Sequence, residues 1–119
     1  MAHIGIVHAR IVKDIETSIK DDLSHTILYS LPINSIYALA ALYEKDEQRA
    51  SDLALRIGAA PTSFTPILDR LEKVGLIARA PHATDRRSIV ISLTPGGKKL
   101  QRAVENAMGN AEVRYGGKQ

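Results

Sequence analysis

Residues 83–97, ATDRRSIVISLTPGG, contain the pattern in this chain that most directly indicates a chemistry. Two arginines, Arg86 and Arg87, follow Asp85 and precede an alternating run of apolar and hydroxyl residues, which predicts a strand. A strand end carries a side chain further from the body of a protein than a helix face does. The narrow, negative minor groove of DNA attracts arginine. The pattern therefore indicates contact with a polyanion, and we expect Asp85 to hold one arginine by a bidentate pair.

The charge along the chain is uneven in a way that supports this interpretation. The net charge is only +3, but residues 61–102 contain 8 Lys/Arg and 3 Asp/Glu, whereas residues 1–60 contain 6 and 8. A basic segment beside an acidic one predicts a one-sided electrostatic surface, which a nucleic-acid partner requires. The plainer alternative is a solvated charged face.

Other classes of chemistry find little support. The chain has no cysteine, which excludes disulfides and thiolate metal sites. Its histidines (His3, His8, His25 and His82) lack metal-ligand spacing. No motif indicates an enzyme or a cofactor. No apolar run approaches the roughly 20 residues of a membrane span, so we expect a cytoplasmic protein with no membrane partner.

The helical elements follow from apolar periodicity. Residues 3–28 have an aliphatic residue at almost every fourth position, which predicts one long amphipathic helix. Further helices are predicted from Pro32 to about Lys45, over Ala50–Ile57 with Gly58 as its stop, and over roughly Thr62–Val74. Residues 46–48 are predicted to be a polar loop. The third and fourth helices form a helix-turn-helix pattern.

After Gly75 the helical spacing of apolar residues ends. Residues 76–79 and 88–93 predict two strands, joined by a charged loop at 80–87. Thr94 is predicted to cap a final helix that begins at Pro95 and extends to about Tyr115. Residues 116–119 are expected to fray.

Together these elements predict a mostly α protein with a small β-hairpin, a winged helix-turn-helix. We divide this single domain into an N-terminal dimerisation helix (1–30), a winged core (31–94), and a C-terminal dimerisation helix with a frayed tail (95–119). In this architecture the second helix of the helix-turn-helix enters the major groove. The hairpin loop, the wing, can then reach the neighbouring minor groove.

The sequence also resembles the MarR family over about residues 31–102. The matching motifs are ASDLA (50–54), SFTPILDRLEKVGLIAR (63–79), TDRRS (84–88) and ISLTPGG (91–97). The resemblance implies a homodimeric DNA-binding regulator, usually a repressor, often released by a small phenolic or lipophilic ligand. It implies that Arg87 enters the minor groove. Its recognition-helix positions fall on Thr62, Ser63, Thr65, Pro66 and Arg70.

Two departures from the family pattern lead to expectations. Pro66 offers no donor, but the missing N–H is harmless at the third helical position; we therefore expect the recognition helix to start late, capped by Ser63, or to bend at Thr65–Pro66. Phe64 is expected in the core, with a thymine methyl contact as the alternative. Only residues 100–115 remain to meet the first helix, so the dimer should be smaller or built mainly from the N-terminal stripe.

The predicted site residues form two sets. Ser35 and Ser51 join the DNA set because a hydroxyl at a helix start can bind phosphate, with simple capping as the alternative. The predicted effector set is weaker, and core packing is its alternative. A basic winged helix that binds an acidic protein, without specific DNA binding, is the competing function. The DNA set is Ser35, Ser51, Thr62, Ser63, Thr65, Arg70, Arg79, Asp85, Arg86 and Arg87, and the effector set is Ile15, Ile19, Tyr37 and Tyr43.

Overall fold

Helix α1 (Ala2–Asp22) begins the part of the chain that the computed structural model describes, which is residues 2–116, with side chains for residues 9–115. The predicted helix over 3–28 is therefore too long. The Thr26 hydroxyl donates to the carbonyl of Leu23 (2.8 Å) and accepts from the N–H of Leu28 (3.1 Å). These bonds end the α-helical pattern and cap a 3₁₀ turn, η1 (Ile27–Ser30). The Ile4 and Val7 side chains of the predicted stripe lie outside the described residues.

Two helices follow as predicted, α2 (Ile33–Glu44) and α3 (Ala50–Ile57). Gly58 ends α3 with a φ of 73°, the left-handed cap that its sequence position predicts. The loop predicted before α3 is wrong in part, because Gln48–Arg49 forms a short strand, β1. The Asp46 carboxylate accepts a 2.9 Å hydrogen bond from the N–H of Leu93 and brings this segment onto the sheet.

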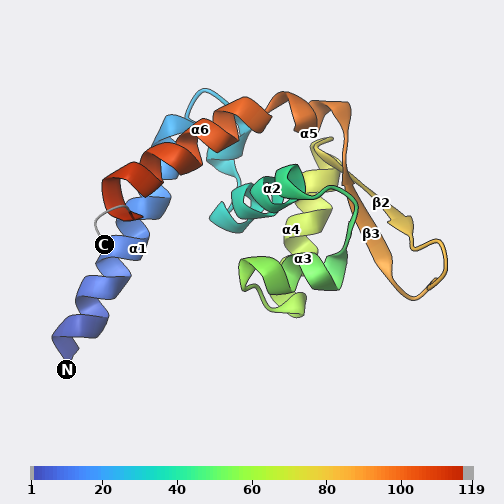
Figure 1. The fold of residues 1–119 in the computed structure, drawn as a ribbon, viewed down its shortest axis with the longest axis horizontal. Helices are drawn as coiled ribbons and strands as arrows, with labels where there is room; N and C mark the ends of the chain where they lie inside the picture. Colours follow the sequence, from blue (N-terminus) through green and yellow to red (C-terminus); the bar gives the residue numbers. More distant parts are fainter. Residues whose placement is uncertain (1, 117–119) are drawn as a thin grey trace.

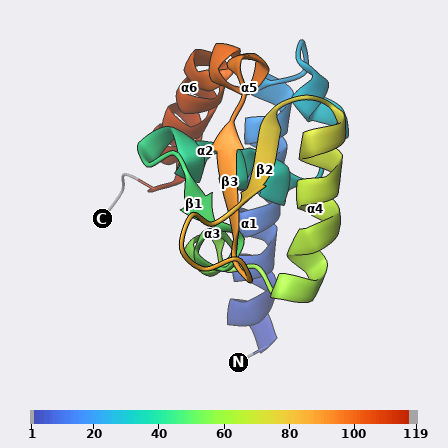
Figure 2. The ribbon, with the colours of Figure 1, turned by 90° about the vertical axis from the view of Figure 1, so that its right-hand side faces the viewer.

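The recognition helix of the predicted helix-turn-helix is α4 (Pro61–Lys73), and the two predicted strands are β2 (Ile77–Pro81) and β3 (Ile89–Leu93). The sheet is antiparallel with the order β1–β3–β2. The predicted hairpin is therefore confirmed, and β1 adds a third strand at its far edge. In Figure 2, α4 lies beside the β2 edge of the sheet, and α3 lies near the lower ends of the strands.

The final helix is divided in two. Thr94 caps α5 (Pro95–Lys99) as predicted, because its hydroxyl accepts a 3.0 Å hydrogen bond from the N–H of Gly97. The chain then breaks at Leu100 and continues as α6 (Gln101–Ala111) and a π-helical turn, η2 (Glu112–Gly116). The break follows a short helix with two glycines, residues of low helix propensity. Residues 117–119 of the predicted tail lie outside the described residues.

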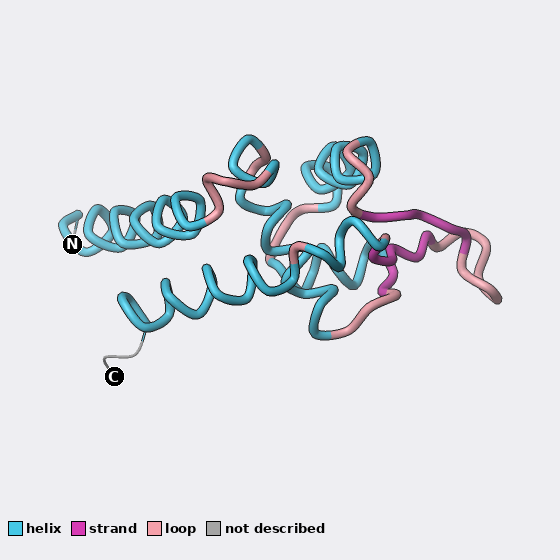
Figure 3. The backbone as a smooth tube through the Cα atoms, turned by 90° about the horizontal axis from the view of Figure 1, so that it is seen from above, coloured by secondary structure: helices cyan, strands magenta, loops and turns pink. Residues whose placement is uncertain are grey.

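Helix α2 is the centre of the molecule, since it contacts α3, α4 and α6. Helices α1 and α6 lie side by side at one end of the long axis, and the β2–β3 hairpin projects at the other (Figures 1 and 3). The molecule measures 47 × 33 × 25 Å. The largest fully buried side chains are aliphatic apart from one phenylalanine: Ile19, Leu23, Leu28, Ile36, Leu39, Leu42, Leu53, Phe64, Leu71, Ile77, Ile91 and Val104.

Candidate nucleic-acid interface

Helix α4 begins earlier than the sequence predicted. Ala60 is its N-cap, and Pro61 occupies the first helical position, where the missing N–H costs nothing. The predicted late start with Ser63 as the cap is therefore wrong, and Pro66 lies inside the helix rather than in its first turn. The alternative, a bend at Thr65–Pro66, stays a prediction. Because proline has no N–H, Pro66 cannot donate to the carbonyl of Thr62 four residues earlier.

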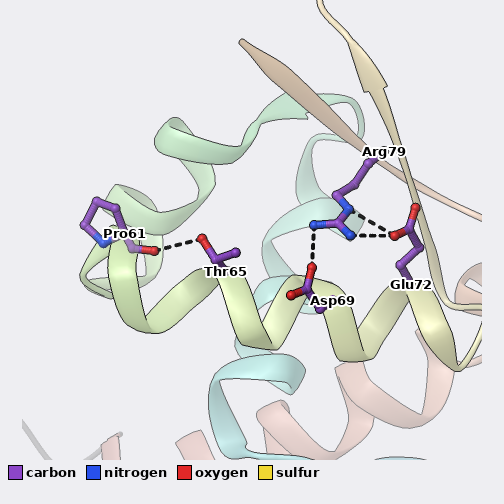
Figure 4. Close-up of polar contacts among 5 residues, drawn as sticks. All are labelled: Pro61, Thr65, Asp69, Glu72 and Arg79. Carbon is purple, nitrogen blue, oxygen red and sulfur yellow. Dashed lines mark hydrogen bonds and ion pairs between the residues drawn. The ribbon is translucent and has the colours of Figure 1, made fainter. Parts of the chain in front are cut away.

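The outward side of α4 presents the residues that the sequence predicted for DNA contact. Thr62, Ser63, Thr65 and Arg70 are exposed, whereas Phe64 is 2% exposed and lies in the core. Two of the hydroxyls donate to backbone carbonyls of the first turn, Ser63 to Ala60 (3.1 Å) and Thr65 to Pro61 (3.2 Å). Figure 4 shows the Thr65 bond. The core prediction for Phe64 is confirmed.

The wing loop, residues 82–88, is organised by two of its own side chains. The Nδ1 atom of His82 accepts the backbone N–H groups of Thr84 (3.2 Å) and Asp85 (3.1 Å). The Asp85 carboxylate accepts the Ser88 hydroxyl (2.9 Å) and the backbone N–H of Arg87 (3.2 Å). These two bonds, that of Ser88 first, hold the pKa of Asp85 below its usual range. The loop therefore has a defined shape in the free protein.

Asp85 does not hold an arginine side chain as predicted. Within the described part of the chain, its carboxylate forms no ion pair with Arg86 or Arg87, because it is occupied by a hydroxyl and a backbone N–H. Both arginines are exposed. In Figures 1 and 2 the wing loop and the first turn of α4 both lie toward the lower side of the molecule. The two predicted contact elements thus lie on one side.

Arg79 links the wing to α4 (Figure 4). From β2, its guanidinium Nη1 lies 2.8 Å from Oδ1 of Asp69, and its Nη2 lies 2.6 Å from Oε1 of Glu72. The Nε atom also donates to Oε1 of Glu72 (3.1 Å). These contacts, that with Glu72 first, raise the pKa of Arg79. The predicted DNA contact Arg79 is therefore engaged within the protein, where it fixes the spacing between β2 and α4.

The two serines at helix starts have different environments. Ser35 is 0% exposed, and its hydroxyl has no hydrogen-bond partner among the described residues. A phosphate cannot reach a side chain that the core covers, so the prediction for Ser35 is wrong. Ser51 is exposed near the start of α3, and its phosphate contact stays a prediction.

Sequence reasoning missed a contact between β1 and the base of the wing. The Nη2 atom of Arg49 lies 3.4 Å from Nε2 of His82. Both side chains line a groove of about 410 Å³ that also contains Lys45 and Arg56. A two-residue strand has no periodicity to detect, so the only signal was the position of Arg49 directly before the third predicted helix. The same groove also contains the carboxylates of Glu47 and Asp52, so its charge is mixed.

The predicted effector residues are not gathered around one cavity. Ile19 is 1% exposed and belongs to the core, as the alternative interpretation expected. The Tyr43 hydroxyl donates a 2.6 Å hydrogen bond to the carbonyl of Gly97. Tyr37 lines a groove of about 240 Å³ together with Met108, and its burial, with Glu16 nearby, raises its pKa. Ile15 packs half-buried against the core.

Two further properties concern the described residues alone. No group of three His, Cys, Asp or Glu side chains there is placed to hold a metal ion. None of the helices within residues 2–116 has both the length and the apolar character to cross a membrane. The side chains of His3 and His8 lie outside the described residues.

The comparisons with known proteins agree with this geometry. A family model described as "MarR family" matches residues 31–89. YfiV of Bacillus subtilis (strain 168), an uncharacterized HTH-type transcriptional regulator, is 34% identical over 83 residues, 70% of this chain and 52% of YfiV. The chain therefore spans about half the length of that relative.

Solved structures share the fold over nearly the whole chain. CouR from Rhodococcus jostii RHA1 bound to p-coumaroyl-CoA is similar with a TM-score of 0.80 and 25% identity, over 98% of this chain and 80% of CouR. Reduced AbfR bound to DNA has the same fold, with a TM-score of 0.79 and 21% identity over 92% of this chain and 74% of AbfR. With its helix-turn-helix, three-stranded wing and matched central segment, the chain belongs to the MarR family.

Proposed function

We propose that this protein is a sequence-specific, double-stranded DNA-binding regulator. It acts in the cytoplasm as a homodimer and represses transcription. Helix α4 lies in the major groove, and Arg87 of the wing enters the adjacent minor groove. The observation that carries this proposal is that the wing loop and the first turn of α4 lie toward one side of the molecule (Figure 2), and that the arginines of the loop and the hydroxyl residues of the turn are exposed. Arg79 keeps these two elements at a fixed spacing.

A second copy of the chain is proposed to pack against the end of the molecule opposite the wing. Ile11 and Val12 of α1 are 43% and 39% exposed, and Val113 and Tyr115 of η2 are 77% and 37% exposed. Helix α1 packs against α6, which continues into η2, so the segments that carry these residues lie at the same end of the molecule (Figure 1). Large exposed apolar side chains at one end favour an interface. Two-fold pairing there places two wings at the outer ends of a dimer, as a palindromic operator requires.

A small phenolic or lipophilic effector is proposed to bind near α1 and α2. The similar protein CouR has been solved bound to p-coumaroyl-CoA, a molecule with a phenolic acyl group. In this chain a groove of about 430 Å³ lies between α1, η1 and α2 and includes Lys13, Lys20 and the Tyr29 ring. Thermal-shift screening with phenolic acids and their thioesters tests the proposal, since a ligand that binds only the folded state raises the unfolding temperature. A screen without any stabilising compound contradicts effector binding.

The test of DNA binding begins with selection of bound duplexes from a random pool. The selected palindrome is then titrated with the wild type, Arg87→Ala and Arg102→Ala at several salt concentrations. Arg87→Ala should weaken binding by about 1–3 kcal/mol. Arg102 is exposed on α6, away from the wing, so Arg102→Ala removes the same charge and should leave the affinity nearly unchanged.

The salt dependence separates DNA binding from binding to an acidic protein. For a DNA-binding protein, the logarithm of the association constant falls linearly with the logarithm of the salt concentration, and preference for one palindrome persists. Equal losses in the two variants would contradict the wing assignment. A pool without any enriched sequence would contradict sequence-specific DNA binding.

A further inference from the structure

Two hydroxyls in the first turns of α4 use their hydrogens within the helix and so present oxygen lone pairs to a ligand. A hydroxyl has one hydrogen and two lone pairs. The hydrogens of Ser63 and Thr65 are donated to the carbonyls of Ala60 and Pro61. Because both side chains are exposed, their oxygens face solvent as acceptors. These two positions are therefore suited to accept hydrogen bonds from a ligand in the major groove.

Pro66 adds a main-chain acceptor to the same surface. It lies inside α4 and cannot donate to the carbonyl of Thr62. Thr62 and Pro66 are both exposed, so this carbonyl belongs to a turn of the helix that faces solvent. Pro66 itself contributes no donor where a polar or basic side chain would contact bases. Between Thr62 and Arg70, whose side chains can both donate, the middle of this helix face therefore presents acceptors.

Asp69 extends this surface by one further turn. It lies seven residues after Thr62, which is nearly two complete turns, so the two residues share one outward line. Arg79 binds Oδ1 of Asp69 at 2.8 Å, and the Asp69 side chain stays 59% exposed. Among the described residues, no hydrogen bond engages Oδ2. Figure 4 shows the guanidinium approaching from the wing side, which fixes the carboxylate and leaves its other oxygen available.

We infer that α4 recognises exocyclic amino groups, with Asp69 as the specificity-determining acceptor and Arg79 as the residue that positions it. The inference rests on the proposed function. In the major groove, only the N4 amino group of cytosine and the N6 amino group of adenine are hydrogen-bond donors, and carboxylates accept from cytosine N4. The half-site therefore contains a cytosine or an adenine opposite Asp69, where an arginine at this position would select guanine.

The charge of Asp69 gives this role a distinctive signature. Arg79 balances one of the two carboxylates of Asp69 and Glu72, so the wing side of α4 keeps one net negative charge. A negative charge near phosphates weakens contact with every DNA sequence. Asp69→Ala should therefore raise the affinity for random DNA and lower the preference for the operator. A purely structural role would lower both affinities.

The experiment compares the wild type, Asp69→Ala and Glu72→Gln in binding-site selection from random duplexes. Alanine is used because an asparagine oxygen would still accept from an amino group. Glu72→Gln is the matched control, because it removes one charge from the same ion-pair network and leaves Asp69 in place. The wild type should enrich one cytosine or adenine in each half-site. Asp69→Ala should lose that preference, and Glu72→Gln should keep it.

Base analogues then test whether the contact is made to the exocyclic amino group of the selected base. The selected cytosine is replaced by 2-pyrimidinone, or the selected adenine by purine, since both analogues lack the exocyclic amino group. The analogue should weaken wild-type binding roughly 5- to 150-fold, the range expected for one good base contact. The analogue should hardly change the binding of Asp69→Ala, which has no acceptor at this position.

Two failures are distinguishable. If the wild type enriches a palindrome and Asp69→Ala enriches the same palindrome with equal preference at each position, the inference is wrong and the proposed function stands. If the wild type enriches no sequence, both are wrong.

Discussion

The hydroxyl of Tyr43 donates a 2.6 Å hydrogen bond to the carbonyl oxygen of Gly97 and so joins the last turn of α2 to α5. Burial, with Glu105 nearby, raises the pKa of this hydroxyl above its usual value of about 10. Gly97 in turn packs against Leu76, which precedes the wing. One chain of contacts therefore connects the central helix, the start of the last helices and the base of the wing.

Tyr43→Phe removes this bond and keeps the ring. We expect it to lower the free energy of unfolding by about 1 kcal/mol, the usual contribution of one intramolecular hydrogen bond. Urea unfolding followed by circular dichroism measures the change. Tyr29→Phe is the control, because the Tyr29 ring is half exposed and the loss of its hydroxyl should have little effect. Equal stability of the Tyr43 variant and the wild type would contradict a stabilising role for the bond.

The same hydroxyl predicts an alkaline dependence. The folded-state pKa of Tyr43 lies above the unfolded value, so the contribution of this group is fully present below about pH 10 and is lost as the pH rises through the folded pKa. The stability of the wild type should therefore fall more steeply above that pH than the stability of Tyr43→Phe. Parallel curves for the two proteins would show that Tyr43 ionises equally in both states.

Gly97→Ala should destabilise the protein, because its new methyl group would overlap the carbonyl oxygen of Leu76. Overpacking of this kind costs about 1–3 kcal/mol. Gly109→Ala is the matched control, since a methyl group there meets nothing within 4 Å. It lies inside α6, where alanine is favoured over glycine by roughly 0.5–1 kcal/mol. Thermal unfolding should thus move in opposite directions for the two variants.

Asp85→Ala should weaken operator binding without removing a DNA contact, because Asp85 shapes the loop that carries Arg87. Its effect should largely disappear in an Arg87→Ala background, since coupled residues give non-additive losses. Titration of the four proteins of this double-mutant cycle measures the coupling. Asp21→Ala, on the exposed side of α1, controls for the loss of one negative charge. Additive losses would mean that Asp85 does not act through Arg87.

Val113→Asp should weaken the proposed dimer. The side chain is 77% exposed in the single chain, so a charge there has little effect on folding, whereas burying it in an apolar interface is unfavourable. Sedimentation equilibrium should show a higher dissociation constant for the variant. Leu55→Asp is the control, because Leu55 is 81% exposed on α3, away from this end. A monomeric wild type at micromolar concentration would contradict the dimer itself.

Much of the fold follows from local rules in the sequence. Gly58 ends α3, and the Thr94–Pro95 pair begins α5, because capping depends on a few adjacent residues. The same rule places Pro61 at the first position of α4. A later start of α4 would follow only if Pro66 had to lie in the first turn of the helix. The helix instead accepts the proline and leaves the Thr62 carbonyl without its usual donor.

Features that depend on distant contacts could not be predicted. Strand β1 exists because Asp46 and the backbone of β3 hold it there, 40 or more residues away in the sequence. Ser35 has the residue type and the position of a phosphate-binding serine at a helix start, but packing buries its side chain. The contact residues were therefore identified by type and motif. Which of them face outward, and which are paired within the protein, required the tertiary structure.

The self-contained hydrogen bonding of the wing loop has a consequence for the kinetics of association. A loop that becomes ordered only on contact loses conformational entropy at that moment, which lowers affinity and slows productive encounters. Here His82 and Asp85 have already restricted residues 82–88 in the free protein. A DNA duplex therefore meets a wing loop that is already ordered. The association rate then depends on electrostatic attraction and on the orientation of the two molecules.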